Sequence, residues 1–374
     1  MDFCKGTRIL NMIRLGIIGG SFDSTISKSH LRAILATNKY KIISGCFSRN
    51  KKKNTKNSNF YNVPLERTYN DFKSFLKIEK KHIDLCVILT PPNNRINIYK
   101  ELIRYNLPFV TEKPFEANLA NTVAARNLLK KNKKLFVGST YNYLNYPAIM
   151  EIPNVLKKIG KINYFNFMMP QQSATFYNNI MKGWRKKDID IPNLHLDLSS
   201  HLLSFILYFF KELPKSVNSS NQISISEGFV VNNNTKLKFM NFNGNLWFSK
   251  NATGNRNNIK LEIYGDKGSI HWEHENHEIL KYFDNKGNIT ILNRLNKNLK
   301  FMSDASLYTY SAGHPFGFLE TFINNYNLIY DAFKKNKKIK NLLTIKENLN
   351  IASILDAMVI SSKKEKWVNI KYIK

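Results

Sequence analysis

The pattern of apolar and polar residues divides the chain near residue 146. Between residues 14 and 138, short apolar runs alternate with segments in which apolar residues recur every three or four positions. The runs predict strands and the spaced segments predict helices. Residues 83–90 (IDLCVILT) are almost wholly apolar, which is typical of a parallel strand buried on both faces. Strands that alternate with helices predict a doubly wound parallel sheet with right-handed connections.

The individual elements of this first part follow from the same pattern. Strands are predicted at residues 14–19, 41–48, 83–90, 108–111 and 135–138. Helices are predicted at residues 29–38, 70–76, 96–105 and 119–131. The low-complexity stretch 50–58 (NKKKNTKNS) predicts a solvated loop.

After residue 146 the pattern changes to that of an antiparallel sheet with helices. Helices are predicted at residues 147–158, 195–210, 317–333 and 345–361. Strands are predicted at residues 162–169, 222–231, 236–242, 246–248, 259–264 and 269–272, separated by glycine-containing turns. The second part is therefore predicted to be an α+β domain with a large, mainly antiparallel open sheet. We expect an extension at residues 1–11, a first domain at 12–146 and a second at 147–374, whose C-terminal helices can pack back on the first.

Charge is the most unusual feature of the composition. The 374 residues include 57 Lys+Arg and 27 Asp+Glu, a formal net charge of +30. Such a charge suggests nucleic acid or an anionic membrane. Lysine is scattered, however, and is accompanied by 50 asparagines, a combination that an AT-rich genome produces through its codons. We therefore interpret the charge as mainly compositional and expect no specific nucleic-acid partner.

Other features bear on the cellular compartment. Cys4, Cys46 and Cys86 are odd in number and widely spaced, so they predict neither a disulfide framework nor a metal site. No apolar run reaches the roughly 18 residues of a membrane span. The N-terminal segment lacks the apolar region of a secretory signal. We expect a cytoplasmic protein without a membrane partner.

A glycine-rich turn follows the first predicted strand. The sequence GIIGGSFDST, residues 16–25, lies between a strand and a helix, where backbone N–H groups and the helix N-terminus favour a dinucleotide pyrophosphate. Gly19, Gly20, Ser21 and Phe22 are therefore candidate cofactor-binding residues. Strict GxGxxG spacing fails at Ser21, so a plain strand-to-helix turn is the alternative.

The end of the second predicted strand bears on the choice of cofactor. An acidic residue at this place binds the ribose of NAD and repels the 2′-phosphate of NADP. Here the strand ends in Ser48 and Arg49, and three lysines follow at residues 51–53. Ser48 can donate to a phosphate and Arg49 can pair with it. We predict that the cofactor is NADP or NAD, with these residues favouring NADP, and the alternative is a solvated basic loop.

Candidate chemistry lies at two further places. Lys113, in the sequence TEKP, follows a predicted parallel strand, and ligands bind at the carboxyl ends of such strands. Asp197 and His201 are four residues apart, so they share one face of an otherwise apolar helix. A helix-start aspartate and a core histidine are the structural alternative for either residue alone.

These segments together resemble the Gfo/Idh/MocA family of NAD(P)-dependent sugar and cyclitol dehydrogenases. The resemblance extends from Arg14 to about Ile370 and rests on RLGIIGG, ILTPPNN, TEKPFEANL, DLSSH, LEIYGDKGSI and GHPFGFLETF, in this order. It is greatest for the branch that carries TYNY–YP, WR–D and GHPEGY-like elements. The resemblance implies a Rossmann domain and an α/β domain whose open sheet often forms an oligomer interface, so we expect a homo-oligomer, a dimer or a tetramer.

The resemblance also implies roles for individual residues. Lys113, Asp197 and His201 take the places of the family's catalytic set, in which His201 accepts the hydroxyl proton, Lys113 stabilises the oxygen and Asp197 orients substrate or imidazole. The resemblance also adds Thr90, Pro91, Glu112 and Lys113 to the residues that are expected to bind the cofactor. Residues expected to contact a sugar, nucleotide-sugar or cyclitol substrate are Tyr141, Asn142, Trp184, Arg185 and His314. The implied mechanism is free of metal.

Some positions depart from the family pattern. Ser21, Asp23 and Ser27 stand where the related branch is rich in glycine, and the Asp23 carboxylate would repel a pyrophosphate. Ser199 replaces a glycine, and Arg95 replaces a histidine that often follows T-P-P. A catalytically weakened binding or scaffold protein is therefore the alternative function.

A histidine-rich stretch raises the question of a metal site. His271, His274 and His277 lie in the sequence HWEHENH, which we expect to be a strand. Alternation along a strand would put His271 and His277 on one side and His274 on the other. With no cysteine and no fourth ligand evident, zinc is not predicted.

Overall fold

The chain forms two compact units. The computed structural model describes residues 12–93, 95–173, 188–225, 228–337 and 339–373. The first unit comprises the described residues up to Glu116 together with Asn121–Asn142 and Gly317–Ile345. The second comprises Ala117–Ala120, Tyr143–Phe316 and the described residues from Lys346 onward. The helix at Phe318–Lys334 thus belongs to the first unit although it is late in the sequence.

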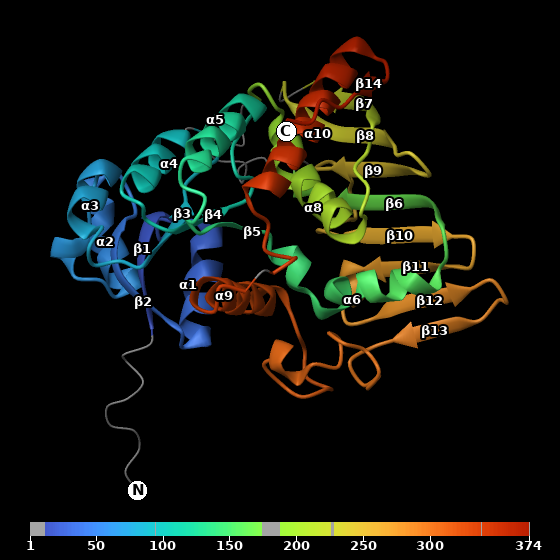
Figure 1. Cartoon of the computed structure of the whole chain (residues 1–374), viewed down its shortest axis with the longest axis horizontal. Helices are drawn as coiled ribbons and strands as arrows, with labels where there is room; N and C mark the ends of the chain where they lie inside the picture. Colours follow the sequence, from blue (N-terminus) through green and yellow to red (C-terminus); the bar gives the residue numbers. More distant parts are fainter. Residues whose placement is uncertain (1–11, 94, 174–187, 226–227, 338, 374) are drawn as a thin grey trace, which may run out of the picture. The chain divides into compact units, whose positions relative to one another are not determined.

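The first unit is built on a parallel sheet of the predicted doubly wound type (Figure 1). Its five strands lie in the order β2-β1-β3-β4-β5, and all their pairings are parallel. The strands are β1 (Ile13–Gly19), β2 (Tyr40–Cys46), β3 (Leu85–Leu89), β4 (Phe109–Glu112) and β5 (Val137–Thr140). The helices are α1 (Thr25–Thr37), α2 (Lys51–Tyr61), α3 (Phe72–Glu79), α4 (Arg95–Arg104), α5 (Leu119–Lys130) and α9 (Phe318–Lys334), with a 3-10 turn η2 (Leu65–Arg67).

Two apolar clusters cover the faces of this sheet. One joins alternate β1 residues to α1 and α9 through side chains such as Leu31 and Ile329. The other joins the opposite face to α3, α4 and α5 through side chains such as Phe75 and Tyr99. Because helices cover both faces, every residue of β3 is buried, as its continuous apolar run predicts.

The predicted loop at residues 50–58 is wrong, because this stretch forms helix α2. Asn50 caps the helix by accepting a hydrogen bond from the Lys53 N–H. The buried face of the helix is largely polar: Asn54, Asn57 and Ser58 are buried and bond neighbouring loops. A helix buried through polar side chains has no apolar period to reveal it.

The second unit contains a nine-stranded sheet of order β13-β12-β11-β10-β6-β9-β8-β7-β14 (Figure 1). Its pairings are antiparallel except that of β6 with β9. The strands are β6 (Ile162–Pro170), β7 (Ser216–Ile223), β8 (Val230–Lys238), β9 (Asn243–Ser249), β10 (Lys260–Gly265), β11 (Gly268–Glu273), β12 (Leu280–Asp284), β13 (Ile289–Leu292) and β14 (Val368–Asn369).

Helices pack on one face of this sheet. They are α6 (Pro147–Val155), α8 (Ser200–Phe209) and α10 (Ile345–Lys364), and the short turns are η3 (Asn142–Asn145), η4 (Leu156–Lys158), η6 (His195–Ser199), η7 (His274–Asn276) and η8 (Ala305–Leu307). Helix α6 contacts β11 and α8 contacts β6. Buried and exposed residues alternate along β8, which gives the sheet one open face. Among the described residues, no helix is long and apolar enough to cross a membrane.

Strand boundaries in this unit differ from the prediction. The predicted strand at residues 222–231 includes the end of β7 and the start of β8, and β12 and β13 were not predicted. For β7 and β8 the cause is polar packing, because Ser219, Asn233 and Thr235 are buried and bond one another at 2.7–2.9 Å. These side chains remove the apolar alternation that marks a strand.

The histidine-rich stretch is also not one strand. Strand β11 ends at Glu273 and the 3-10 turn η7 follows. The rings of His274 and His277 are therefore neighbours, 6.0 Å apart, and the predicted alternation of these two side chains is wrong. His274 bonds the Tyr146 hydroxyl and His277 bonds the Phe316 carbonyl, so both have structural partners.

Candidate active site

The glycine-rich turn lies at the point where the first sheet reverses its strand order. Strand β1 has β2 on one side and β3 on the other, and ligands of doubly wound sheets bind at such a point. Gly19 and Gly20 have φ angles of +83° and +73°, in the region that favours glycine. A Cβ on Gly19 would lie 2.7 Å from the Thr90 backbone nitrogen. The turn is thus closely packed on the end of β3, before the N-terminus of α1, and fits a pyrophosphate.

Helix α2 organises this turn. The Asn57 side-chain oxygen accepts hydrogen bonds from the Phe22 N–H at 2.8 Å and from the Ser21 hydroxyl at 3.4 Å. The Tyr61 hydroxyl donates to the Gly20 carbonyl. Ser21 therefore replaces the expected glycine without leaving the turn unsupported.

The carboxylate in the turn has a cationic partner. Lys53 lies 2.6 Å from Asp23, and its hydrogen bond lowers the pKa of the Asp23 carboxyl. Both side chains are about half exposed, so solvent screens the pair. The ammonium nevertheless offsets the repulsion that Asp23 would exert on a phosphate.

Ser48 and Arg49 lie between β2 and α2. The Ser48 hydroxyl accepts a hydrogen bond from the Asn50 N–H at 3.1 Å, and Ser48 is partly buried. Arg49 is exposed, directly before the cap of α2. This arrangement presents a guanidinium and a helix N-terminus at the edge of the sheet, both of which favour an anion.

Glu112, the last residue of β4, is held in a buried network. It accepts hydrogen bonds from His30 at 2.9 Å and from the Thr140 hydroxyl at 2.5 Å. Burial is the largest influence and opposes ionisation, but hydrogen bonds from His30 and Thr140, together with the charges of His30 and Lys113, outweigh it and lower the pKa of Glu112. The other ring nitrogen of His30 bonds Tyr326 of α9 at 2.8 Å. The network ties α1, β4, β5 and α9 together directly beside Lys113.

Arg95, at the start of α4, is a buried guanidinium that fixes the backbone around Lys113. It donates to the carbonyl of Glu112 and, at 2.5 Å, to the carbonyl of Pro114. It also donates to the Thr90 carbonyl at 3.0 Å. Arg95 thus joins the loops that follow β3 and β4, and it holds the residues on both sides of Lys113. Lys113 itself is partly buried and precedes a cis peptide bond to Pro114.

The remaining predicted residues of the first unit differ in exposure. Pro91 is exposed and Thr90 is partly buried at the end of β3. Tyr141 is fully buried, which raises the pKa of its phenol. Asn142 is buried and donates to the Thr321 hydroxyl at 3.3 Å.

Asp197 in the second unit lies in a π-helical turn, η6, which leads into α8. Such turns are frequent at functional sites. The Lys250 ammonium, just beyond β9, lies 2.8 Å from the Asp197 carboxylate. The Lys250 side chain is only 4% exposed and that of Asp197 is 17% exposed.

His201 is buried in the next turn of the same helix. Its ring meets the ring of Tyr143 edge to face, with centroids 4.7 Å apart. The Tyr143 hydroxyl accepts a hydrogen bond from Asn257 at 2.7 Å. Burial raises the pKa of Tyr143 to about 12, and the negative charge of Asp197 contributes to that shift. The Tyr143 ring thus contacts the His201 ring, and the charge of Asp197 helps to raise the Tyr143 pKa.

The remaining predicted substrate residues are His314, Trp184 and Arg185. His314 is exposed in the second unit, where its backbone carbonyl accepts a hydrogen bond from Arg294. Trp184 and Arg185 lie outside the described residues.

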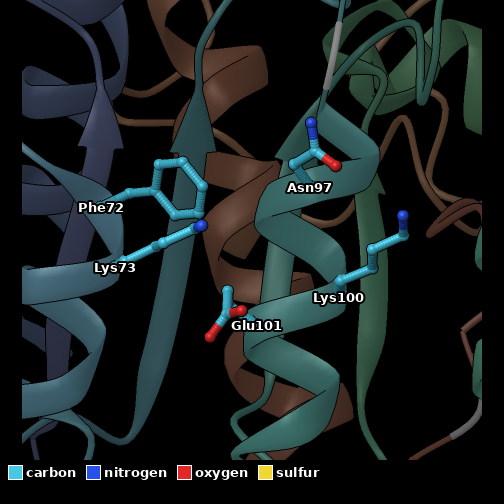
Figure 2. A pocket seen from close by; sticks show the side chains of 5 residues that line it. All are labelled: Phe72, Lys73, Asn97, Lys100 and Glu101. Atoms are coloured by element: carbon cyan, nitrogen blue, oxygen red, sulfur yellow. The ribbon is translucent and has the colours of Figure 1, made fainter.

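One surface pocket of the first unit contains no predicted site residue. Its volume is about 430 Å³, and it lies between α3 and α4 (Figure 2). Its lining residues are Phe72, Lys73, Asn97, Lys100 and Glu101. The pocket is therefore not part of the candidate site that the predicted residues define.

Comparison with known families identifies both units. The profile described as "Oxidoreductase family, NAD-binding Rossmann fold" of GFO_IDH_MocA matches residues 13–139. The profile of the C-terminal alpha/beta domain of the same family matches residues 153–370. The chain belongs to the Gfo/Idh/MocA oxidoreductase family.

Individual relatives of this Gfo/Idh/MocA oxidoreductase are distant. The uncharacterized oxidoreductase YfiI of Bacillus subtilis (strain 168) is 22% identical over 285 residues, 72% of each chain. The inositol dehydrogenase homolog of Azotobacter vinelandii, complexed with NADH and myo-inositol, has a TM-score of 0.87 at 20% identity and covers 97% of this chain and 98% of its own. A levoglucosan dehydrogenase complexed with NADH has a TM-score of 0.85 at 19% identity, covering 96% and 100%. At these identities the two structures establish the shared fold.

The structure adds residues that were not predicted. His30, Thr140, Tyr143 and Lys250 all contact predicted residues. Thr140 and Tyr143 carried a signal in the sequence, because both lie within the TYNYLNYP segment. His30 and Lys250 lie in ordinary helical or strand sequence, and their partners are 82 and 53 positions away.

Acid should destabilise this oxidoreductase through His195. His195 is fully buried, and burial lowers its pKa from 6.5 to about 4. Between these values the unfolded chain binds a proton that the folded chain does not, so stability falls as pH falls from 6.5 towards 4, by at most about 3 kcal/mol. His195→Gln retains an N–H donor for Asn221 and removes this titration.

Urea unfolding at pH 7.0 and pH 4.5 measures this effect. We expect the variant to lose less stability than the wild type between the two values. His82→Gln, which alters an exposed histidine, should lose as much as the wild type. Equal losses in all three proteins would contradict the role of His195.

Proposed function

We propose that this chain transfers a hydride between NADP and a secondary alcohol or ketone of a sugar, nucleotide-sugar or cyclitol. The observation that carries the proposal is the framing of Lys113 by Arg95 and by the Glu112–His30 network, at the same sheet edge as the glycine-rich turn. A lysine held this firmly at the carboxyl end of a parallel strand is suited to act on a bound substrate. Membership of the oxidoreductase family supports the reaction class.

Three residues divide the acid–base work in this proposal. His201 accepts the hydroxyl proton when the alcohol is oxidised and returns it when the ketone is reduced. Lys113 donates a hydrogen bond to the same oxygen and stabilises the negative charge that develops there. Asp197 accepts hydrogen bonds from substrate hydroxyls and orients the ring.

The first unit supplies the residues that would hold the dinucleotide. The packed glycines Gly19 and Gly20, with Ser21 and Phe22, would hold the pyrophosphate. Thr90, Pro91 and Glu112 lie at or next to the ends of neighbouring strands and would line the nicotinamide side. When bound, the nicotinamide supplies or accepts the hydride.

Two experiments test the proposal directly. Millimolar NADP should raise the melting temperature of the purified protein, and NAD should raise it less. With NADP present, a panel of cyclitols, sugars and nucleotide-sugars should include a substrate that increases absorbance at the wavelength of reduced nicotinamide. If neither cofactor shifts the melting temperature, the dehydrogenase function is contradicted. Cofactor binding with no turnover on the panel would favour the catalytically weakened binding or scaffold protein.

Arg49 provides a sharper test of the cofactor. Arg49→Ala should weaken NADP binding about 10-fold or more and leave NAD binding almost unchanged, because a charge-assisted bond to the 2′-phosphate contributes about 1.5–3 kcal/mol. Isothermal titration with both cofactors measures the effect. Arg32→Ala removes another exposed arginine of the same unit, on α1, and should change neither affinity. Equal loss of NAD and NADP binding in Arg49→Ala would contradict the 2′-phosphate role.

We also propose a cytoplasmic homo-oligomer. The open face of the nine-stranded sheet supports an oligomer, because it presents exposed Tyr164 and Ile291. Cys46 and Cys86 are buried free thiols, which suit a reducing compartment. Light scattering during gel filtration should give a dimer or tetramer, and a monomer at micromolar concentration would contradict the oligomer.

A further inference from the structure

Lys250 is a buried lysine whose place in the fold calls for an explanation. Its side chain is 4% exposed, and its ammonium lies 2.8 Å from Asp197. Burying an ammonium is unfavourable unless an opposite charge compensates it. A methionine or leucine at the end of β9 would fill similar space without that cost. The charge therefore points to a role beyond packing.

Both partners of this ion pair have fixed backbones. The Lys250 N–H donates to the Val231 carbonyl at 2.8 Å, which anchors it to β8. Asp197 lies in the π turn, where the buried His195 ring bonds Asn221 at 2.8 Å. Because these hydrogen bonds anchor the chain at or near both partners, the contact of the Lys250 ammonium with Asp197 Oδ2 orients the carboxylate.

The ion pair also affects which residue accepts the proton. Groups that can titrate near Asp197 are Lys250 from the end of β9, Tyr143 from η3 and His201 from the next helical turn. An ammonium in contact with the carboxylate favours its ionised form, while Tyr143 stays a neutral phenol. Asp197 is thereby kept as a hydrogen-bond acceptor.

We propose that Lys250 is a positioning residue, which holds Asp197 ionised and oriented towards substrate hydroxyls and leaves proton transfer to His201. This inference rests on the proposed function, since it assigns Lys250 a part in the same reaction. Lys250 itself acts through Asp197.

The test compares Lys250→Met, Lys250→Arg and a matched control. Lys250→Met should lower kcat about 100-fold through misorientation of Asp197. It should also move the acid limb of the kcat/KM profile to higher pH, because Asp197 loses the cation in contact with its carboxylate. Lys250→Arg keeps the charge and should restore most of kcat. Lys260→Met breaks an exposed lysine–glutamate pair on the same sheet and should leave both the rate and the profile unchanged.

A double-mutant cycle in thermal unfolding tests the ion pair without any activity. Lys250→Met alone should lower the melting temperature, and adding Asp197→Asn should recover part of the loss, because no unpaired charge remains. An active wild type whose Lys250→Met variant keeps its kcat and its acid limb would overturn the inference alone. A wild type that binds no cofactor and oxidises no substrate overturns the proposed function, and the inference with it, even if the unfolding cycle shows coupling.

Discussion

Lys113→Met is expected to lower kcat about 1,000-fold and to leave folding intact. The size follows from the proposed role, because one ammonium supplies the hydrogen bond to the oxygen whose charge develops in the transition state. Methionine keeps the length and the apolar part of the side chain. The backbone around position 113 should remain in place, since Arg95 binds the carbonyls of Glu112 and Pro114 rather than the lysine side chain.

Steady-state kinetics and cofactor titration on the same preparation separate these effects. Lys73→Met is the matched control, since Lys73 is on α3 beside the surface pocket, outside the candidate site. It should retain the kcat of the wild type. A Lys113→Met variant with kcat within tenfold of the wild type would refute the assigned role, and a variant with normal unfolding but weak NADP binding would move that role to the cofactor.

The strands of the first unit could be predicted because each has a simple environment. Strand β3 is covered by helices on both faces, so its sequence is continuously apolar. Helix α2 could not be predicted, since Asn54 and Asn57 are buried by hydrogen bonds rather than by apolar contact. The same holds for β7 and β8, where Ser219 and Asn233 replace the apolar alternation. The spacing of apolar residues predicts where apolar side chains are buried, but it does not predict where polar side chains are buried.

The candidate site shows a similar division. Lys113 could be found because it follows a strand, and Asp197 because it interrupts an apolar segment. Their supporting residues could not be found: His30 is 82 positions from Glu112 and 296 from Tyr326, and Lys250 is 53 from Asp197. Such partners are set by the topology of the sheet.

Two residues that depart from the family pattern have partners in the structure. Asp23 in the glycine-rich turn is matched by Lys53, and Ser21 is bonded by Asn57. Helix α2 supplies both partners, so the turn is supported at both departing positions. This compensation favours a turn that still binds a dinucleotide over one that has lost the ability.

Arg95→Leu is expected to affect stability and catalysis together. The Arg95 guanidinium donates hydrogen bonds to the carbonyls of Thr90, Glu112 and Pro114, and Arg95 is 2% exposed. Leucine would leave these acceptors buried without donors, which should lower the free energy of unfolding by about 3 kcal/mol. It should also release the loop around Lys113 and lower kcat about 100-fold, because small displacements of a reacting group are costly.

Partial rescue distinguishes positioning from simple loss of stability. Arg95→His restores the residue type often found after T-P-P in the family, and it retains N–H donors for at least part of the carbonyl set. We expect it to recover more kcat than Arg95→Leu when both are measured well below their melting temperatures. Arg32→Leu, which alters an exposed arginine on α1, should change neither urea midpoint nor kcat. If Arg95→Leu unfolds at the wild-type urea concentration, the carbonyls have found other donors and the guanidinium does not hold the Lys113 loop.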